Sequence, residues 1–413
     1  MIDRRTLLQA GLCGIAAPSL LGRLAFAAPD TKKVLVVVML RGAVDGLSVV
    51  APCADDSYYA ARPTIAVARP DDTAKPEAER LLRLDDRFGL HPAMQPLHRA
   101  FSERRLAFVH AAGSPAATRS HFDAQDYMES GTPDRKATED GFLNRLLASS
   151  AKAADTELRA IAVTNAMPRI MSGQARAVVF STLGDLSLGQ GKGAASTGAS
   201  FEAMYAAAVH DVLHGPTQEV FDVARQIEKA GVTKMKPENG AVYPKDAFGR
   251  SLSEIAALIR ANLGVQIAFT DIGGWDTHAS QGGATGQLAK RLDVLAKSLD
   301  AFAIDLGKRM DDVVVVAMSE FGRTVRENGS RGTDHGHGNV MLVAHGGVRG
   351  GKVYGTWPGL GEGQRFEGRD LAVTTDFREV LWQVAAKHLR ATNRDVVFPG
   401  FTPVADASAL ALF

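Results

Sequence analysis

Aspartate and histidine residues are concentrated in a glycine-rich segment, "RGTDHGHGNV", which contains Asp334, His335 and His337. Carboxylates and neutral imidazoles are common metal ligands in proteins. An extended His-x-His segment can direct both rings at one ion, or at two neighbouring ions, and the glycines permit a tight backbone path. We therefore expect Asp334, His335 and His337 to form a metal-binding or catalytic loop. The alternatives are a rigid turn and a surface for a partner protein.

Two further segments contain residue types suited to binding metals or anions. The segment "GWDTH" contains Asp276 and His278, a carboxylate and an imidazole in a glycine-flanked loop, although an ordinary loop around a buried tryptophan would have the same residues. The segment "MSEFGRT" contains Glu320 and Arg323. These two residues are candidates for the same site, and the alternative is a salt bridge at the end of a strand.

Two candidate residues lie nearer the N-terminus. Ser120 precedes "HFDAQDYMES" and has the position of a helix N-cap, where an anionic group is also stabilised. This capping role is compatible with a catalytic role. Asp45 lies in "RGAVDGLS", where Asp45-Gly46 could also form only a turn. His345, by contrast, lies in an apolar segment and is expected to be structural.

Strands and helices that alternate along the chain are expected to position these residues. Apolar segments rich in β-branched residues predict strands that are buried on both faces, as in a parallel α/β sheet. Ligands bind outside the carboxyl ends of such strands, and the candidate residues follow several of them. The predicted strands are 32–40, 104–113, 158–164, 265–270, 312–319 and 339–347, and helices are expected within 91–103, 251–263, 285–309 and 375–389.

The beginning of the chain resembles an export signal. An Arg4-Arg5 pair precedes a mildly apolar stretch that ends in Ala25-Phe26-Ala27, which predicts a twin-arginine signal peptide over residues 1–27. The alternative is a retained anchor or an amphipathic helix. The signal predicts a periplasmic or secreted protein with no transmembrane anchor after cleavage. Residues 28–413 are expected to form a single domain.

The interior of the chain contains one region of different character. Residues 186–200 are rich in glycine and serine and lack periodicity, which predicts a loop, and a helix is expected near 201–231. We therefore expect an insertion or lid over about 130–248.

Composition excludes some classes of function. The formal net charge is +1, so there is no electrostatic basis for binding nucleic acid or an anionic membrane. Cys53 is the one cysteine that remains after signal cleavage, which excludes an intramolecular disulfide in the mature protein.

Six stretches resemble the secreted bacterial family known as domain of unknown function 1501: "LRGAVDGLSVVAP", "FGLHPAMQPL", "RSHFDAQDYMESG", "GWDTH", "MSEFGRT" and "GTDHGHGNVMLV". That family in turn resembles the alkaline phosphatase-like superfamily, which includes sulfatases and phosphomutases. The resemblance implies an alkaline phosphatase-like α/β fold, with a mostly parallel central sheet that has helices on both faces.

The resemblance also implies a role for each candidate residue. Asp45 corresponds to the metal-binding aspartate after the first strand, and Ser120, or else Thr118, to the hydroxyl nucleophile. Asp276 and His278 correspond to a ligand pair, with closer spacing than is usual. Glu320 stands where the superfamily has an Asp-His pair, so Asp334, His335 and His337 would supply the remaining ligands. Cys53 lies outside a sulfatase-type sequence context, which argues against a formylglycine mechanism.

These roles predict an exported metal-dependent hydrolase of phosphate or sulfate esters, or a phosphoryl transferase. One or two divalent ions, zinc first and otherwise manganese, magnesium or calcium, would assist Ser120, and Arg323, Arg41 or Arg119 would bind the anionic ester. One alternative is hydrolysis by a metal-activated water without Ser120. Another is a non-catalytic exported factor with a degenerate metal site, which acts with an envelope protein partner in envelope assembly or secretion.

Overall fold

The computed structural model of the protein describes residues 32–136, 138–150, 157–186, 214–403 and 410–413. The predicted signal peptide, with Arg4 and Arg5, lies outside the described residues, as does all but the first residue of the glycine-rich segment 186–200. Among the helices of the described part of the chain, none is both long and apolar enough to cross a membrane.

A central sheet of nine strands organises the described residues, with the order β11-β5-β10-β9-β1-β8-β6-β7 and with β12 beside β5. All six predicted strands are confirmed. The sheet is mostly parallel, as expected, because β10 alone runs antiparallel to its neighbours β9 and β5. Its strands are β1 (Val34–Arg41), β5 (Leu106–Gly113), β6 (Ala160–Val163), β7 (Val178–Phe180), β8 (Ile267–Gly273), β9 (Val313–Met318), β10 (Asn339–His345), β11 (Lys352–Tyr354) and β12 (Thr375–Asp376).

The two faces of the sheet pack against separate hydrophobic cores. Along β1, Val34, Val36 and Val38 belong to one core, whereas Leu35 and Val37 belong to the other. Side chains alternate between the faces of a strand, so a strand that is apolar throughout must be covered on both faces. This explains why the continuous apolar segments of the sequence form the centre of the sheet.

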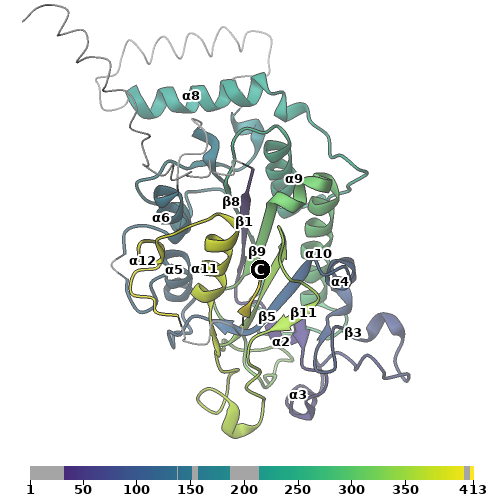
Figure 1. Cartoon of the computed structure of the whole chain (residues 1–413). Coiled ribbons are helices and arrows are strands. Elements are labelled where there is room, and N and C mark those ends of the chain that lie inside the picture. Colours follow the sequence, from purple (N-terminus) through teal and green to yellow (C-terminus); the bar gives the residue numbers. More distant parts are fainter. Residues whose placement is uncertain (1–31, 137, 151–156, 187–213, 404–409) are drawn as a thin grey trace, which may run out of the picture.

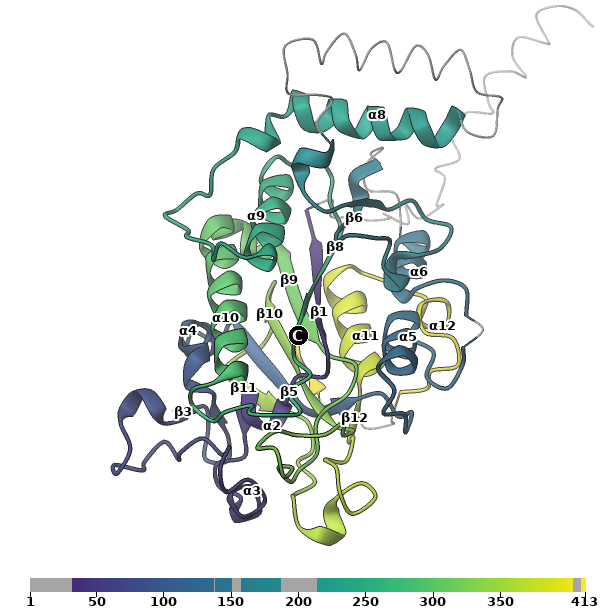
Figure 2. The ribbon, with the colours of Figure 1, turned by 180° about the vertical axis from the view of Figure 1, so that it is seen from behind.

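Helices cover both faces (Figures 1 and 2). One core contains side chains from α4, α9 and α10, and the other contains side chains from α5, α6, α11 and α12. A small antiparallel sheet lies beside them, in the order β2-β4-β3. The bounds of these elements are α2 (Gly46–Val49), α3 (Asp56–Ala61), α4 (Gln95–Ser102), α5 (His121–Ser130), α6 (Phe142–Ser149), α8 (His214–Lys229), α9 (Ala247–Arg260), α10 (Gln287–Leu306), α11 (Phe377–His388), α12 (Arg394–Val397), β2 (Val50–Ala51), β3 (Leu82–Arg83) and β4 (Gly89–Leu90).

The region expected to be an insertion, 130–248, contributes two strands to the central sheet. In that region β6 pairs in parallel with β8 and with β7. Part of the expected helix near 201–231 is present as α8, and the rest lies outside the described residues. The residues of β6 and β7 therefore belong to the central sheet and not to a separate insertion.

Candidate metal centre

Three histidines and one aspartate meet at the carboxyl edge of the central sheet. His121 is the first residue of α5, and Asp276 and His278 lie in the loop that follows β8. His335 lies in the glycine-rich loop that precedes β10. The four side chains therefore come from three segments that are far apart in the sequence.

The ring nitrogens of these histidines lie close to one another and to the aspartate. His335 Nε2 lies 3.0 Å from His121 Nε2 and 3.0 Å from His278 Nε2. Asp276 Oδ1 lies 2.9 Å from His278 Nε2 and 3.2 Å from His335 Nε2, and Asp276 Oδ2 lies 3.6 Å from His121 Nε2. His121, Asp276 and His335 offer ligand atoms that all lie within 4.8 Å of one another, and His278 adjoins two of these residues.

The other nitrogen of each ring faces a hydrogen-bond acceptor. His121 Nδ1 lies 2.8 Å from Glu320 Oε1, His335 Nδ1 lies 2.9 Å from the Arg119 carbonyl oxygen, and His278 Nδ1 lies 3.0 Å from Asp334 Oδ1. A carbonyl or carboxylate oxygen accepts hydrogen bonds, so each Nδ1 bears the proton. In the neutral rings the Nε2 lone pairs then point into the shared space. Metal-binding histidines are oriented in the same way, by an acceptor on the second nitrogen.

The arrangement favours a cation and has a suitable size for a metal ion. Without a cation, Nε2 lone pairs would face each other at 3.0 Å beside a carboxylate. A tetrahedral zinc site with Zn–N distances of about 2.0–2.1 Å has ligand atoms about 3.3 Å apart. The five separations given above, from 2.9 to 3.6 Å, lie around this value, with Asp276 contributing Oδ1 or Oδ2. The donor set of imidazole nitrogens and a carboxylate oxygen also suits zinc.

The acids around the cluster are ionised. Burial favours the neutral form of Glu320, but hydrogen bonds from His121 and Gln125 lower the pKa of its carboxyl group. Burial likewise opposes the charge on Asp276, whereas the Arg323 guanidinium lowers the pKa of Asp276. The hydrogen bond to Glu320 raises the pKa of His121. Burial lowers the pKa of His335, so without a metal ion His121 binds a proton more readily than His335 does.

The glycine-rich loop reaches the site by pairing with the segment that follows β9. Thr324 N donates to the Asp334 carbonyl oxygen at 2.9 Å, and Gly336 N donates to the Gly322 carbonyl oxygen at 2.8 Å. A Cβ atom on Gly336 would lie 2.4 Å from the carbonyl carbon of Arg323, which is too close for any other residue type. Glycine is required here because two backbones approach closely.

Phe321 forms an apolar wall beside the cluster. It is buried, and its ring centroid lies 4.9 Å from that of His121 and 5.1 Å from that of His335. Phe321 stands where the resemblance predicts a ligand histidine. His121 supplies an imidazole to this part of the site instead, from a different element.

Asp45 and His337 are not brought to the cluster. Both oxygens of Asp45 accept from Arg62, at 2.6 and 3.0 Å, and both side chains are completely buried. The ring of His337 stacks on Phe366 with centroids 4.2 Å apart, and burial lowers the pKa of His337 to about 4. In a regular strand, residues two positions apart point to the same face. His335 and His337 precede β10 and lie in an irregular loop, so their side chains do not share a face.

Arg323 and Ser120 lie next to the cluster, the first buried and the second exposed. The Arg323 guanidinium is buried and donates to Asp276 Oδ1 at 2.5 Å and to the carbonyl oxygens of Ala43 and Gly42, both at 2.7 Å. It orients Asp276, and its donors are occupied by protein acceptors. Ser120 is exposed, caps α5, and precedes His121 directly.

The sequence did not predict a role for His121. Two signals pointed to it: its position after a predicted helix cap in the loop that follows a predicted strand, and its place in the family stretch "RSHFDAQDYMESG". Glu320 and Asp334 do lie at the site, where they accept from the Nδ1 atoms of His121 and His278.

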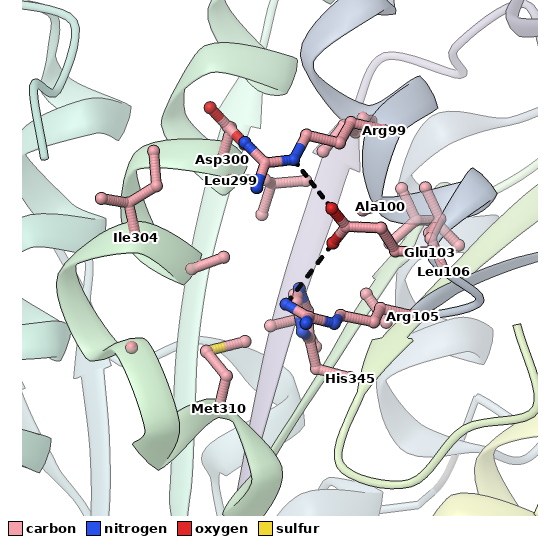
Figure 3. Close-up of a pocket in the computed structure, with 16 residues that line it drawn as sticks. Arg99, Ala100, Glu103, Arg105, Leu106, Leu299, Asp300, Ile304, Met310 and His345 are labelled. Carbon is pink, nitrogen blue, oxygen red and sulfur yellow. Dashed lines mark hydrogen bonds and ion pairs between the residues drawn. The ribbon is translucent and has the colours of Figure 1, made fainter.

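A separate cavity of about 250 Å³ lies at the opposite edge of the sheet (Figure 3). His345, Met310 and Leu106 line it, and the carboxylate of Glu103 lies between Arg99 and Arg105 at its rim. None of the three histidines of the cluster lines this cavity.

The comparisons with known proteins give a family and two distant structural neighbours. The C-terminal periplasmic domain of EptC from Escherichia coli, solved in complex with Zn, has 8% sequence identity and a TM-score of 0.36, and the alignment covers 77% of this chain and 74% of that one. The lipoteichoic acid synthase LtaP from Listeria monocytogenes has 10% identity and a TM-score of 0.35, with 77% and 68% covered. Sequence identities and TM-scores this low give no basis for assigning the activity of either protein to this chain.

No curated protein matches this sequence. The family model described as "Protein of unknown function (DUF1501)" matches residues 32–397, which span nearly the whole described chain and every residue of the cluster. The chain belongs to the DUF1501 family.

Proposed function

We propose that this protein is an exported metal-dependent hydrolase of phosphate or sulfate esters, or a phosphoryl transferase, of the alkaline phosphatase-like type. The observation that supports this proposal is the convergence of three Nε2 atoms on Asp276, each from a ring whose Nδ1 faces an acceptor. His121, Asp276 and His335 would bind a divalent ion, and His278 would complete the ligand set. Zinc fits this donor set best, ahead of manganese, magnesium and calcium.

The bound ion would neutralise charge on an ester oxygen and favour the anionic form of a nearby hydroxyl group. Ser120 is the proposed nucleophile because it is exposed and lies directly before the ligand His121. It also caps the N-terminus of α5, where the backbone N–H groups and the helix dipole stabilise an anion. Asp45 and His337 are left out of the proposed ligand set.

One observation favours the second candidate, a non-catalytic exported factor that acts with an envelope protein partner. The three arginines expected to bind the ester all pair with carboxylates. Arg41 contacts Glu129 and Asp271, Arg119 contacts Asp370 and Glu367, and Arg323 contacts Asp276. A substrate anion would have to compete with these partners, or rely on the metal ion and the start of α5.

The experiment combines elemental analysis with a test of ester hydrolysis. Protein purified from the periplasm should contain zinc or another divalent metal, and it should hydrolyse p-nitrophenyl phosphate or p-nitrophenyl sulfate. Ser120→Ala should retain the metal and lose the hydrolysis. A metal-loaded wild-type protein that hydrolyses neither ester would support the second candidate. Full activity in Ser120→Ala would point to water as the nucleophile.

A further inference from the structure

Gln281 belongs to the loop between β8 and α10 that supplies Asp276 and His278, and its side chain reaches the glycine-rich loop that supplies His335. The side chain is completely buried. Its Oε1 atom accepts from Thr277 Oγ1 at 2.8 Å and from Thr333 Oγ1 at 2.8 Å. Its Nε2 atom donates to Asp45 Oδ2 at 2.7 Å. With a longer contact from Nε2 to Ser48 Oγ at 3.5 Å, one amide group makes four buried side-chain hydrogen bonds.

The two threonines lie within two residues of proposed ligands in the sequence. Thr277 lies between Asp276 and His278, and Thr333 lies two residues before His335. The backbones of the two threonines also pair, since Thr333 N donates to the Thr277 carbonyl oxygen at 3.1 Å. The Gln281 oxygen thus joins two loops whose separation sets the distance between Asp276 and His335.

The Asp45–Arg62 ion pair fixes the orientation of the Gln281 amide. The Asp45 carboxylate can only accept hydrogen bonds, so the NH₂ group of Gln281 must face it and the amide oxygen must face the threonines. Arg62 binds both Asp45 oxygens and also donates to the carbonyl oxygens of Val325 and Thr324, both at 2.9 Å. Thr324 pairs in turn with the backbone of Asp334.

We propose that Gln281, oriented by the buried Asp45–Arg62 pair, is a positioning residue that sets the spacing of the two ligand loops and thereby the affinity for the metal ion. This inference rests on the metal centre proposed above. It gives Asp45 a role at the site without direct contact with the ion. Direct hydrogen-bond partners of metal ligands commonly change metal affinity by about 10- to 100-fold, and Gln281 acts one contact further from the ion.

The test compares two variants. Each replaces a buried amide side chain with an apolar side chain of similar shape. Gln281→Met keeps the length of the side chain and removes its hydrogen bonds. Asn144→Leu is the matched control, because Asn144 is buried and makes three hydrogen bonds, with the Met171 and Ala175 carbonyl oxygens and with Ala175 N, away from the cluster. Zinc affinity is measured by competition with a chromophoric chelator, and site geometry by the visible absorption of the cobalt(II)-loaded proteins.

Gln281→Met should bind zinc about 10- to 100-fold more weakly and should change the cobalt spectrum. Asn144→Leu should be less stable, with wild-type affinity and spectrum. Thr333→Val should weaken zinc binding like Gln281→Met, and Thr333→Ser, which retains the hydroxyl group, should restore it. If Gln281→Met fails to fold, the Thr333 pair decides the question.

Wild-type zinc affinity and an unchanged cobalt spectrum in Gln281→Met, or in Thr333→Val, would overturn the inference and leave Gln281 with a purely structural role. His335→Ala separates this outcome from failure of the metal centre itself. If His335→Ala loses zinc while Gln281→Met does not, the centre stands and the positioning role is wrong. If His335→Ala also binds zinc normally, the centre is wrong.

Discussion

His335 and His337 are separated by one glycine, but their rings have different surroundings. His335 lies among His121, His278 and Asp276, whereas His337 packs on Phe366. Only the first of these environments offers other ligand atoms at the distance that a metal ion requires. The two histidines of the segment therefore have different proposed roles.

This difference predicts contrasting effects of alanine substitutions. His335→Ala should lose bound metal, because it removes a ligand at the centre of the cluster. His337→Ala should retain the metal and lose stability, by about 2–4 kcal/mol, because it leaves a cavity beside Phe366. Elemental analysis and urea unfolding of both variants would test this. Loss of metal in His337→Ala alone would show that the wrong histidine has been assigned.

Glu320 has a role through His121, whose Nδ1 lies 2.8 Å from its carboxylate. Glu320→Gln keeps the shape of the side chain but weakens the acceptor that fixes the ring of His121. We expect metal affinity to fall by about 10- to 100-fold while the fold is retained. Titration with zinc in the presence of a competing chelator would measure the change. An unchanged affinity would mean that Glu320 does not support the ligand.

Only part of the site could be predicted from the sequence, because long-range partners decide what each side chain does. Asp276, His278 and His335 follow predicted strands and meet as expected at one edge of the sheet. Asp45 also follows a strand, but Arg62, 17 residues further along the chain, occupies both of its oxygens. His121 lies in a family stretch to which no ligand role was attached, and its role depends on the direction in which α5 enters the site.

The strands could be predicted because the sequence pattern that indicates each strand lies within the strand itself. A continuous apolar segment such as Val34–Leu40 predicts a buried strand without any knowledge of its neighbours. The reversed direction of β10 could not be predicted, because strand direction depends on the path of the whole chain. That reversal places the glycine-rich loop, which precedes β10, at the same edge as the ends of β8 and β9.

Two buried histidines join elements that are far apart in the sequence and predict a dependence of stability on pH. His110 contacts the Val50 carbonyl oxygen through Nε2 and accepts from Ala111 N through Nδ1, and His91 contacts Gly283 O and Ala93 N in the same way. Both nitrogens of each neutral ring are thus satisfied. Burial lowers the pKa of both rings to about 4.

The unfolded chain, with histidine pKa values of about 6.5, binds more protons than the folded chain between pH 6.5 and pH 4. The stability from these two rings is therefore fully present above pH 6.5 and is lost as pH falls towards 4, by at most about 1.4 kcal/mol per pH unit for each ring. Urea unfolding in EDTA at pH 7.5 and pH 5 would measure the slope. His110→Leu should reduce this slope, and an unchanged slope would exclude the titration of His110 as a cause.

Twin-arginine export predicts that the protein folds and binds its metal ion before transport. Twin-arginine export is proposed from Arg4 and Arg5, and this route accepts proteins that fold and bind their cofactor before transport. Arg4→Lys combined with Arg5→Lys should leave the protein in the cytoplasm with its signal uncleaved. Cell fractionation with detection of both forms would show this. Normal arrival of the double variant in the periplasm would rule out the twin-arginine route.

Metal binding should also set the stability of the whole domain, because the ligands come from segments that are brought together only in the folded chain. A ligand that binds only the native state stabilises it by about 2.7 kcal/mol at 100 times its dissociation constant. Zinc should therefore raise the melting temperature of the chelator-treated protein. The increase should shrink between pH 7.5 and pH 5.5, since protons compete for the Nε2 lone pairs. The hydrogen bond to Glu320 raises the pKa of His121 and burial lowers the pKa of His335, so this competition is stronger at His121 than at His335.

His345→Ala provides the control for the metal-dependent shift, since His345 lines the cavity at the opposite edge of the sheet (Figure 3). This variant should have a lower melting temperature because of lost packing, but the increase on adding zinc should equal that of the wild type. His335→Ala should show little increase, and the chelator-treated forms of His335→Ala and wild type should melt at similar temperatures. If zinc, manganese, magnesium and calcium all leave the wild-type melting temperature unchanged, the three rings share protons instead of a metal ion. The non-catalytic exported factor would then be the better account of the molecule.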